Sequence, residues 1–342
     1  MDPRPGPVAS PDQAAKTSFV QVTAPLPCDL AWEVESLLLK VFEYGDYSFR
    51  SALTGRYAET LDCVFTLARR EGTLAGVAGC LHARADPALA LLGPVAVAQE
   101  YRRNGLGAKL IQSAVDYLKT RECVAIYLGV SKGNPAIRLY EAAGFRPYRG
   151  IVMRLLPFGE GQVQDLGFGE VSDVSIRPVT WGDFPAVQAL AVWPARMYTF
   201  DLPRGIFSSQ YCEPSRFLSV FPEMMRAFAR TGGGAHVLRA GERQDVVGIA
   251  WMRRLPAQAQ QHVAEFDLFV CDDFLAQATP LAKATLQLRG SLAVRQTYCA
   301  CVSGDHLKRE ILEQLGARSV ATLPGQVCLK GESMDVLLYR ID

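Results

Sequence analysis

The stretch YRRNGLGAKLIQSAVDYLKTRE, residues 101–122, decides the fold of this sequence. Its apolar residues recur at helical spacing, which predicts a helix over residues 105–120 that begins directly after a glycine-containing loop. The first turn of a helix has N–H groups without partners inside the helix, and the helix dipole adds partial positive charge there. A phosphate group is stabilised at such a position.

The loop carries the residue types that suit a diphosphate. Gly105 and Gly107 lack a Cβ, so the backbone can approach a pyrophosphate closely and direct several N–H groups at it. Arg102 and Arg103 add positive charge. A motif of the form R-x-x-G-x-G also recurs by chance as an ordinary turn before a surface helix, so its sequence context must decide between the two interpretations.

The segments on both sides of the loop favour ligand binding. The apolar run LALLGPVAV, residues 89–97, predicts a strand that leads into the loop, and Pro94 predicts a bulge where a backbone N–H is left free. Further along, NPAIRLYEAAGF predicts a helix with Asn134 at its start, Tyr140 in its middle and Gly144 just after its end. Loop and helix together place several polar groups near the end of one strand.

This order of strand, R-x-x-G-x-G loop, helix, strand and N-x-x-x-x-x-Y-x-x-x-G-F segment resembles the acyl-CoA signature of the GNAT family of N-acetyltransferases. The resemblance covers residues 18–156. It implies direct transfer of an acetyl group from acetyl-CoA to a primary amine, in a ternary complex without a covalent enzyme intermediate and without a metal.

The resemblance also implies roles for individual residues. The N–H of Val97 would polarise the thioester carbonyl, and Tyr140 would protonate the departing CoA thiolate. A tyrosine packed on a helix face is the alternative reading of Tyr140. The cofactor-binding residues that the resemblance implies are Val95, Ala96, Val97, Arg102, Arg103, Asn104, Gly105, Leu106, Gly107, Ala108, Asn134 and Tyr140.

The sequence defines the amine site and the general base less sharply. The cofactor strand has only Ala, Leu, Gly, Pro and Val where the family often has an acid. Glu43, Tyr44 and Asp46 lie where the family's first helices wall the substrate pocket, and His82 lies on a neighbouring predicted strand. We name these four as candidate substrate-binding residues. The alternatives are solvated charges at a helix end for the two acids and a structural role for His82, while Phe49 either lines the pocket or packs.

The second half of the chain repeats the order of elements in the first. TYCACVSGDHLKREILEQLGARSV, residues 297–320, can be aligned with residues 124–148 as strand, loop, helix, glycine turn and strand, which indicates a diverged internal duplication. With Gly316 opposite Gly144, His306 replaces Asn134 and Leu312 replaces Tyr140. Two acids of the segment CDDF take the place of the arginines, and they would repel a pyrophosphate.

The predicted fold class is therefore α+β (α/β), with two tandem GNAT-like domains that each have a mixed, mostly antiparallel central sheet flanked by helices. The second domain is predicted to be degenerate, not to bind CoA in the usual manner, and to complete or cover the acceptor site. The predicted boundaries are a disordered segment at residues 1–17, a catalytic domain at 18–157, a linker at 158–173 and the degenerate domain at 174–342.

Composition limits the function classes. The chain has 36 basic and 35 acidic side chains, so no strong overall field collects nucleic acid or an anionic membrane surface. The nine cysteines lack paired C-x-x-C spacing, which favours reduced thiols over disulfides or zinc. The sequence shows neither a secretory signal nor an apolar run that spans a bilayer. We expect a cytoplasmic protein without nucleic-acid or membrane partners.

Three functions are compatible with these features. The first is an acetyltransferase that acts on a small-molecule amine, as a monomer whose two halves form an internal pseudo-dimer. The second is a protein lysine or N-terminal acetyltransferase. The third is a non-catalytic regulatory module that binds acetyl-CoA, against which Tyr140 argues because a sensor needs no acid.

Overall fold

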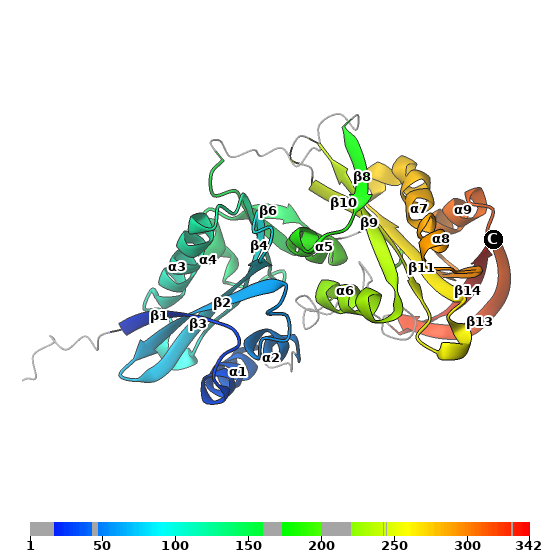
Figure 1. Cartoon of the computed structure of the whole chain (residues 1–342). Helices are drawn as coiled ribbons and strands as arrows, with labels where there is room; N and C mark the ends of the chain where they lie inside the picture. Colours follow the sequence, from blue (N-terminus) through cyan, green and yellow to red (C-terminus); the bar gives the residue numbers. More distant parts are fainter. Residues whose placement is uncertain are drawn as a thin grey trace, which may run out of the picture.

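The computed structural model of the chain contains two seven-stranded mixed sheets flanked by helices (Figure 1). The predicted α+β class with two tandem GNAT-like units is confirmed. The residues that the structure describes are 17–42, 47–159, 173–193, 195–199, 220–241, 243, 245–329 and 331–342. Most of the predicted amino-terminal segment and residues 160–172 of the predicted linker lie outside them.

The first sheet has the strand order β1-β2-β3-β4-β5-β7-β6. Among its strands, β4 and β5 are parallel, and the other neighbours are antiparallel. The strands are β1 (Thr17–Thr23), β2 (Leu61–Arg70), β3 (Thr73–Ala83), β4 (Leu89–Val97), β5 (Ala125–Gly129), β6 (Arg146–Arg149) and β7 (Val152–Leu155). The helices are α1 (Cys28–Phe42), α2 (Tyr47–Leu53), the 3-10 helix η1 (Gln99–Tyr101), α3 (Leu106–Thr120) and α4 (Ile137–Ala142).

Two helices cover the opposite faces of this sheet. The strand β4 shows why, because its successive side chains point to alternate faces. Leu91 belongs to the buried group that contains the residues of α1, whereas Ala90 and Leu92 belong to the group that contains those of α3. Each helix buries one apolar stripe on its side. Because α3 packs on one face of the sheet, its start lies close to the end of β4, and only η1 and a short loop separate the two.

Three details of the first domain stand out beside the sequence analysis. The helix α1 begins at Cys28, and Asp29 lies in its first turn. The strand predicted after the Gly144 turn is β6, which has only four residues and includes Pro147. The helix predicted to begin at Gly105 begins at Leu106, with Gly105 as its N-cap.

The second sheet has the order β13-β14-β12-β11-β10-β9-β8. Its strands are β8 (Val174–Pro178), β9 (Gly233–Ala240), β10 (Asp245–Arg254), β11 (Val263–Val270), β12 (Gln296–Val302), β13 (Arg318–Leu329) and β14 (Glu332–Ile341). Its helical elements are η2 (Trp181–Asp183), α5 (Phe184–Ala191), α6 (Val220–Thr231), η4 (Gln258–Gln260), η5 (Asp272–Gln277), α7 (Ala278–Leu286), α8 (Leu288–Ser291) and α9 (His306–Gln314). The helix α6 was not predicted from the sequence.

The two sheets share their topology. When β8 is placed on β1, the strand order of both sheets is the same, and β11 is parallel to β12 just as β4 is parallel to β5. The turns also agree, because the N–H of Phe145 donates to the carbonyl of Tyr140 and the N–H of Ala317 donates to that of Leu312. This shared architecture supports the predicted internal duplication.

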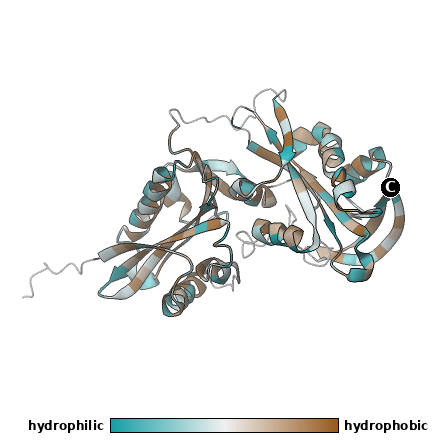
Figure 2. Ribbon diagram, in the orientation of Figure 1, coloured by the Kyte–Doolittle hydropathy of each residue, from teal (hydrophilic) through white to brown (hydrophobic). Residues whose placement is uncertain are grey.

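The helix α5 joins the two halves into one core. All of its side chains are buried, and it contacts β3, β4 and β5 of the first sheet as well as β10 of the second. Figure 1 shows α5 between the two sheets. In Figure 2 the strands carry much of the hydrophobic colour, and the outer helices also show hydrophilic residues. A continuous buried cluster therefore runs through both halves.

The buried residues include most of the cysteines. Six of the eight cysteines that the structure describes are buried free thiols, and two of them, Cys299 and Cys301, lie two residues apart on β12. Burial raises the pKa of the Cys63 thiol to about 12, so this group packs as a small apolar side chain. Among the described helices, none is both long and apolar enough to cross a membrane.

Candidate active site

The strands β4 and β5 pair at their starts and then separate. Their parallel register runs from Leu89 opposite Ala125 to Leu91 opposite Tyr127. Beyond this point a cleft of about 920 Å³ opens, bounded by the ends of both strands and the starts of α3 and α4. Its volume falls within the range of about 300–1,000 Å³ that is typical of small-molecule sites.

The strand β4 directs free backbone groups into this cleft. The N–H of Ala98 donates to the carbonyl of Ala75 on the β3 side, at 3.0 Å. Since backbone groups alternate along a strand, the N–H and C=O of Val97 and Val95 point to the other edge, where β5 has diverged. The carbonyl of Val97 accepts a hydrogen bond from Arg102 Nε, so this edge offers a ligand the N–H groups of both residues and the carbonyl of Val95.

A bulge interrupts β4 beside the cleft, as Pro94 predicted. The register with β3 shifts between Ala78 and Cys80, opposite Gly93 and Pro94. A Cβ on Gly79 would lie 2.7 Å from the carbonyl oxygen of Gly93, so only glycine fits there. The bulge bends the strand and helps to open the cleft.

The loop after β4 has the shape expected of an anion cradle. Gly105 is the N-cap of α3 with a φ of +70°, a conformation that favours glycine, and nothing lies within 4 Å of the position of its missing Cβ. A Cβ on Gly107 would lie 3.0 Å from Leu139 on α4. The first N–H groups of α3 therefore face a space that no side chain fills.

The charged residues that line the cleft are all cationic. They are Arg102, Arg103 and Lys132, and no carboxylate is among the lining residues that the structure describes. The side chain of Arg102 is held by a hydrogen bond from Nε to the carbonyl of Val97, at 3.0 Å. Sequence reasoning missed Lys132, whose position two residues before Asn134 was the available signal. Cations, helix N–H groups and absent Cβ atoms together fit a CoA diphosphate.

The helix α4 brings two polar side chains to the same cleft. Asn134 Oδ1 accepts a hydrogen bond from the N–H of Ala136 at 2.9 Å, which fixes the asparagine at the start of the helix. Tyr140 lies edge-on to Phe145, with ring centroids 6.2 Å apart. Burial raises the pKa of Tyr140 to about 12, so the phenol stays protonated at neutral pH and can donate a proton.

Apolar side chains line another part of the cleft. Val41 and Phe42 come from α1, Phe49 from α2 and Ile151 from the turn between β6 and β7. The rings of Phe42 and Phe49 lie 5.6 Å apart. The predicted substrate-binding residues Glu43, Tyr44 and Asp46 lie outside the described residues.

The fourth predicted substrate residue, His82, is not among the residues that line the cleft. It is fully buried, with Nε2 3.1 Å from the hydroxyl of Tyr117 on α3 and Nδ1 3.2 Å from the carbonyl of Ala83. Burial lowers the pKa of His82, which favours the neutral ring. This arrangement suits a structural histidine with both nitrogens satisfied.

The structure brings the predicted cofactor residues together. Every one of them lines the cleft except Asn104, which is exposed in the loop between Arg103 and Gly105. They come from β4, the following loop, the start of α3 and the region of α4, which are separated in the sequence by up to 45 residues. One enclosed space thus contains a diphosphate cradle, a free strand edge and a protonated phenol.

The comparisons with known proteins agree with this geometry. Residues 31–145 match the model of the acetyltransferase (GNAT) family. The first domain is a GNAT domain. Among curated proteins, none matches this sequence.

Solved GNAT structures are similar to about half of the chain. The N-acetyltransferase of Staphylococcus aureus Mu50 is 17% identical, with 50% of this chain and 99% of that one covered and a TM-score of 0.38. For yncA of Salmonella typhimurium with its cofactor acetyl-CoA, the identity is 12%, the coverages are 49% and 93%, and the TM-score is 0.40. A chimera of the spermidine N-acetyltransferase SpeG from Vibrio cholerae and hSSAT is 15% identical, with 50% of this chain and 96% of that one covered and a TM-score of 0.37.

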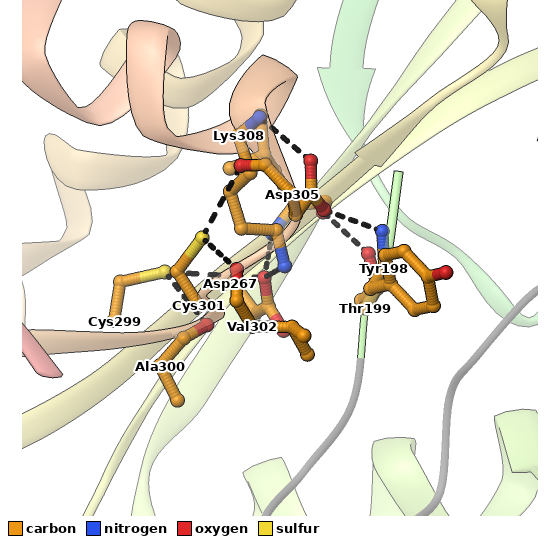
Figure 3. Close-up of polar contacts among 10 residues, drawn as sticks. Tyr198, Thr199, Asp267, Cys299, Ala300, Cys301, Val302, Asp305 and Lys308 are labelled. Atoms are coloured by element: carbon orange, nitrogen blue, oxygen red, sulfur yellow. Dashed lines mark hydrogen bonds and ion pairs between the residues drawn. The ribbon is translucent and has the colours of Figure 1, made fainter. Parts of the chain in front are cut away.

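In the second domain, described groups of the chain itself contact the strand edge between β11 and β12 that corresponds to the GNAT cleft. These strands also pair only at their starts, from Val263 to Glu265 on β11. Beyond this point Thr199 Oγ1 donates to the carbonyl of Leu268 at 2.6 Å, and the N–H of Tyr198 donates to Asp305 Oδ2 at 2.6 Å. Figure 3 shows this segment beside Asp305. The chain itself occupies the strand edge.

A buried ion pair closes the same region of the second domain. Lys308 on α9 is fully buried and donates from Nζ to Asp267 Oδ1 on β11, at 2.6 Å (Figure 3). Its own N–H donates to Asp305 Oδ1 at 2.9 Å. Burial lowers the pKa of Lys308, but Asp267 together with Asp305 and the neighbouring thiols raises it further, so the net pKa lies above its ordinary value and the lysine stays charged. The space between β11 and α9 is thus bridged by protein groups.

Proposed function

We propose that the chain is an acetyl-CoA-dependent N-acetyltransferase that moves the acetyl group directly to a primary amine of a small molecule, in a ternary complex. The observation that carries the proposal is that one cleft of the GNAT domain contains both the cationic cradle at the start of α3 and the protonated Tyr140. A pure acetyl-CoA sensor would need the cradle and not the phenol.

The residues of the cleft would hold acetyl-CoA, which supplies an acetyl group activated as a thioester. The N–H groups at the start of α3 and the cations Arg102, Arg103 and Lys132 would bind its diphosphate. Asn134 would hold the cofactor arm. The free edge of β4 at Val95 and Val97 would bind the extended arm as an added strand does.

The N–H of Val97 would then supply the electrophilic assistance. It points into the cleft and would donate a hydrogen bond to the carbonyl oxygen of the thioester, where negative charge develops. A fixed backbone donor needs no reorganisation during the reaction. This is an oxyanion hole with a single donor.

Tyr140 would hold the proton that the departing sulfur takes up. Burial raises the pKa of Tyr140 to about 12, so the phenol carries its proton at neutral pH. The leaving sulfur becomes basic as its bond to the acetyl group breaks, and the phenol would donate its proton to that sulfur.

The amine would reach the cleft through the part lined by α1, α2 and the β6–β7 turn. Phe42, Phe49 and Ile151 would contact its apolar portion. Glu43, Tyr44 and Asp46 remain predicted contacts to the amine, with either acid as its base. Where no carboxylate is at hand, the amine would lose its proton to water before the transfer.

The test is a thiol-release assay with acetyl-CoA and a panel of amines. The panel contains an arylalkylamine, an alkylamine, spermidine and a lysine-containing peptide. We expect release with at least one small amine and its loss in Tyr140→Phe. Release with the peptide alone would favour protein acetylation. Acetyl-CoA binding without release from any amine would favour the regulatory module.

Reduced thiols also lead us to propose a cytoplasmic location, and we propose that the protein is a monomer.

A further inference from the structure

The β6–β7 hairpin belongs to the GNAT domain but is held by the second domain. Three of its side chains, Tyr148, Arg149 and Arg154, contact residues of the carboxyl-terminal half. The turn of the hairpin carries Ile151 into the cleft, and the carbonyl of Ile151 accepts a hydrogen bond from the N–H of Val130 at the end of β5. The position of one cleft wall is therefore connected to the second domain.

The strongest of these contacts is the ion pair between Arg154 and Asp245. Arg154 Nη1 lies 2.8 Å from Asp245 Oδ1, and the two side chains are only 12% and 15% exposed. The guanidinium also lies 4.1 Å from the centre of the Tyr148 ring. A pair so shielded from water is worth more than a surface ion pair, and loss of one partner leaves a charge that is expensive to bury.

A second group of contacts lies nearer the turn. Trp193 packs edge-on against Tyr148 with ring centroids 5.5 Å apart, and the guanidinium of Arg149 lies 4.8 Å from the centre of the Trp193 ring. Arg149 also pairs with Asp273 at 3.3 Å. A cation over an aromatic face is attracted by the negative charge of the ring face. The second domain therefore contacts the hairpin on both sides of Ile151.

We propose that the second domain is a positioning domain: it fixes the β6–β7 hairpin and thereby sets the affinity of the GNAT domain for its amine. The inference rests on the proposed function. Asp245, Trp193 and Asp273 are positioning residues, because they act on the amine through Ile151. The cradle at the start of α3 has no such connection to the second domain among the described contacts, so acetyl-CoA affinity should be independent of them.

The test compares the KM for the amine with the KM for acetyl-CoA in Asp245→Asn. This change keeps the size of the side chain and removes its charge. We expect the amine KM to rise about five-fold and the acetyl-CoA KM to stay within about two-fold. The conservative Asp245→Glu should restore much of the amine affinity. In a double-mutant cycle with Ile151→Ala, the two effects on the amine KM should combine to less than their product.

Asp273→Asn is the second variant, because this side chain is 60% exposed and its loss spares the fold. Asp272→Asn is its matched control. It removes the same charge from the neighbouring residue of η5, whose partner at 2.9 Å is Arg196 of the second domain. We expect the amine KM to rise in Asp273→Asn and to stay unchanged in Asp272→Asn.

Two results would overturn the inference. One is an unchanged amine KM in both Asp245→Asn and Asp273→Asn. The other is an equal rise in both KM values, which would indicate a general loss of structure. Neither result would touch the proposed function, whose failure would appear as the absence of thiol release in the unmodified protein.

Discussion

Val95 and Leu268 occupy the same place in the two sheets and meet opposite surroundings. Val95 lies opposite Ala78 on β3, and Leu268 lies opposite Ala250 on β10. The N–H and C=O of Val95 face an open cleft. At Leu268 the N–H donates to Asp267 Oδ1 at 2.8 Å, and the carbonyl accepts from Thr199. The same strand edge is therefore open to the cleft in the first sheet and satisfied by the chain's own groups in the second.

The comparison also explains why the second domain retained its fold without the cleft. In the sequence alignment Lys308 stands at the place of Ala136, two residues after Asn134, for which we propose a contact to the cofactor. Its ammonium reaches Asp267 and closes the gap that the diverging strands leave. The backbone groups and charges that an acyl-CoA would have satisfied are satisfied internally. At this position the described polar groups contact one another and stabilise the second domain.

The largest predicted effect is on the stability of the second domain. Lys308→Met would leave Asp267 buried without its cation, and the loss of one partner of a buried pair costs about 3–5 kcal/mol. Denaturant unfolding measures this change. The exposed Lys283 on α7 provides a control, since Lys283→Met should change stability by less than about 0.5 kcal/mol. If the two variants unfolded alike, the ion pair would not be what holds the second domain closed.

The next effect concerns chemistry in the GNAT domain. Tyr140→Phe removes the proton donor and keeps the ring, so kcat should fall about 100-fold or more, with little change in acetyl-CoA affinity. Steady-state kinetics and calorimetry measure the two quantities. Tyr117→Phe is a matched control, because burial raises the pKa of its phenol to about 12 as well and it bonds His82 outside the cleft. Equal kcat values in both variants would remove Tyr140 from the mechanism.

A smaller effect separates the cradle from an ordinary turn. Gly105→Ala strains a backbone with φ of +70°, and Gly316→Ala strains the helix end of the second domain, where φ is +76°. Each should cost about 1–2 kcal/mol of stability. Only Gly105→Ala should also weaken acetyl-CoA binding, by about ten-fold, because it moves the N–H groups that bind the diphosphate. Calorimetry should show one site per chain, and a second site would contradict the closed state of the second domain.

The sequence predicted more of the GNAT domain than of the second domain. In the first, the glycines, arginines, Asn134 and Tyr140 stand at the spacings of a known motif, and the structure brings them to one cleft. The carboxylates of Asp267 and Asp305 have no such signal. Their partners Lys308 and Tyr198 lie 41 and 107 residues away, and only the folded sheet brings them together.

The connection between the domains was equally hidden. Arg154 and Asp245 are 91 residues apart, and neither belongs to a motif. The helix α5 is buried on every face because the two sheets pack against it. Its apolar residues alone do not indicate which surfaces cover them. Such an interface depends on residues from both domains, so neither segment predicts it by itself.

The smallest predicted effect is the absence of a basic limb in the pH dependence of kcat. Because burial raises the pKa of Tyr140 to about 12, its proton-donating form is fully present at lower pH and is lost only as the pH rises through that value. At saturating amine, kcat should therefore change less than about two-fold between about pH 8 and 10 on account of this residue. Tyr140→Phe should show the same profile at a lower level. A fall in kcat over this range that disappears in Tyr140→Phe would mean that the phenol titrates near its ordinary value, and that Tyr140 is more exposed to water during turnover than in this structure, where it is partly buried.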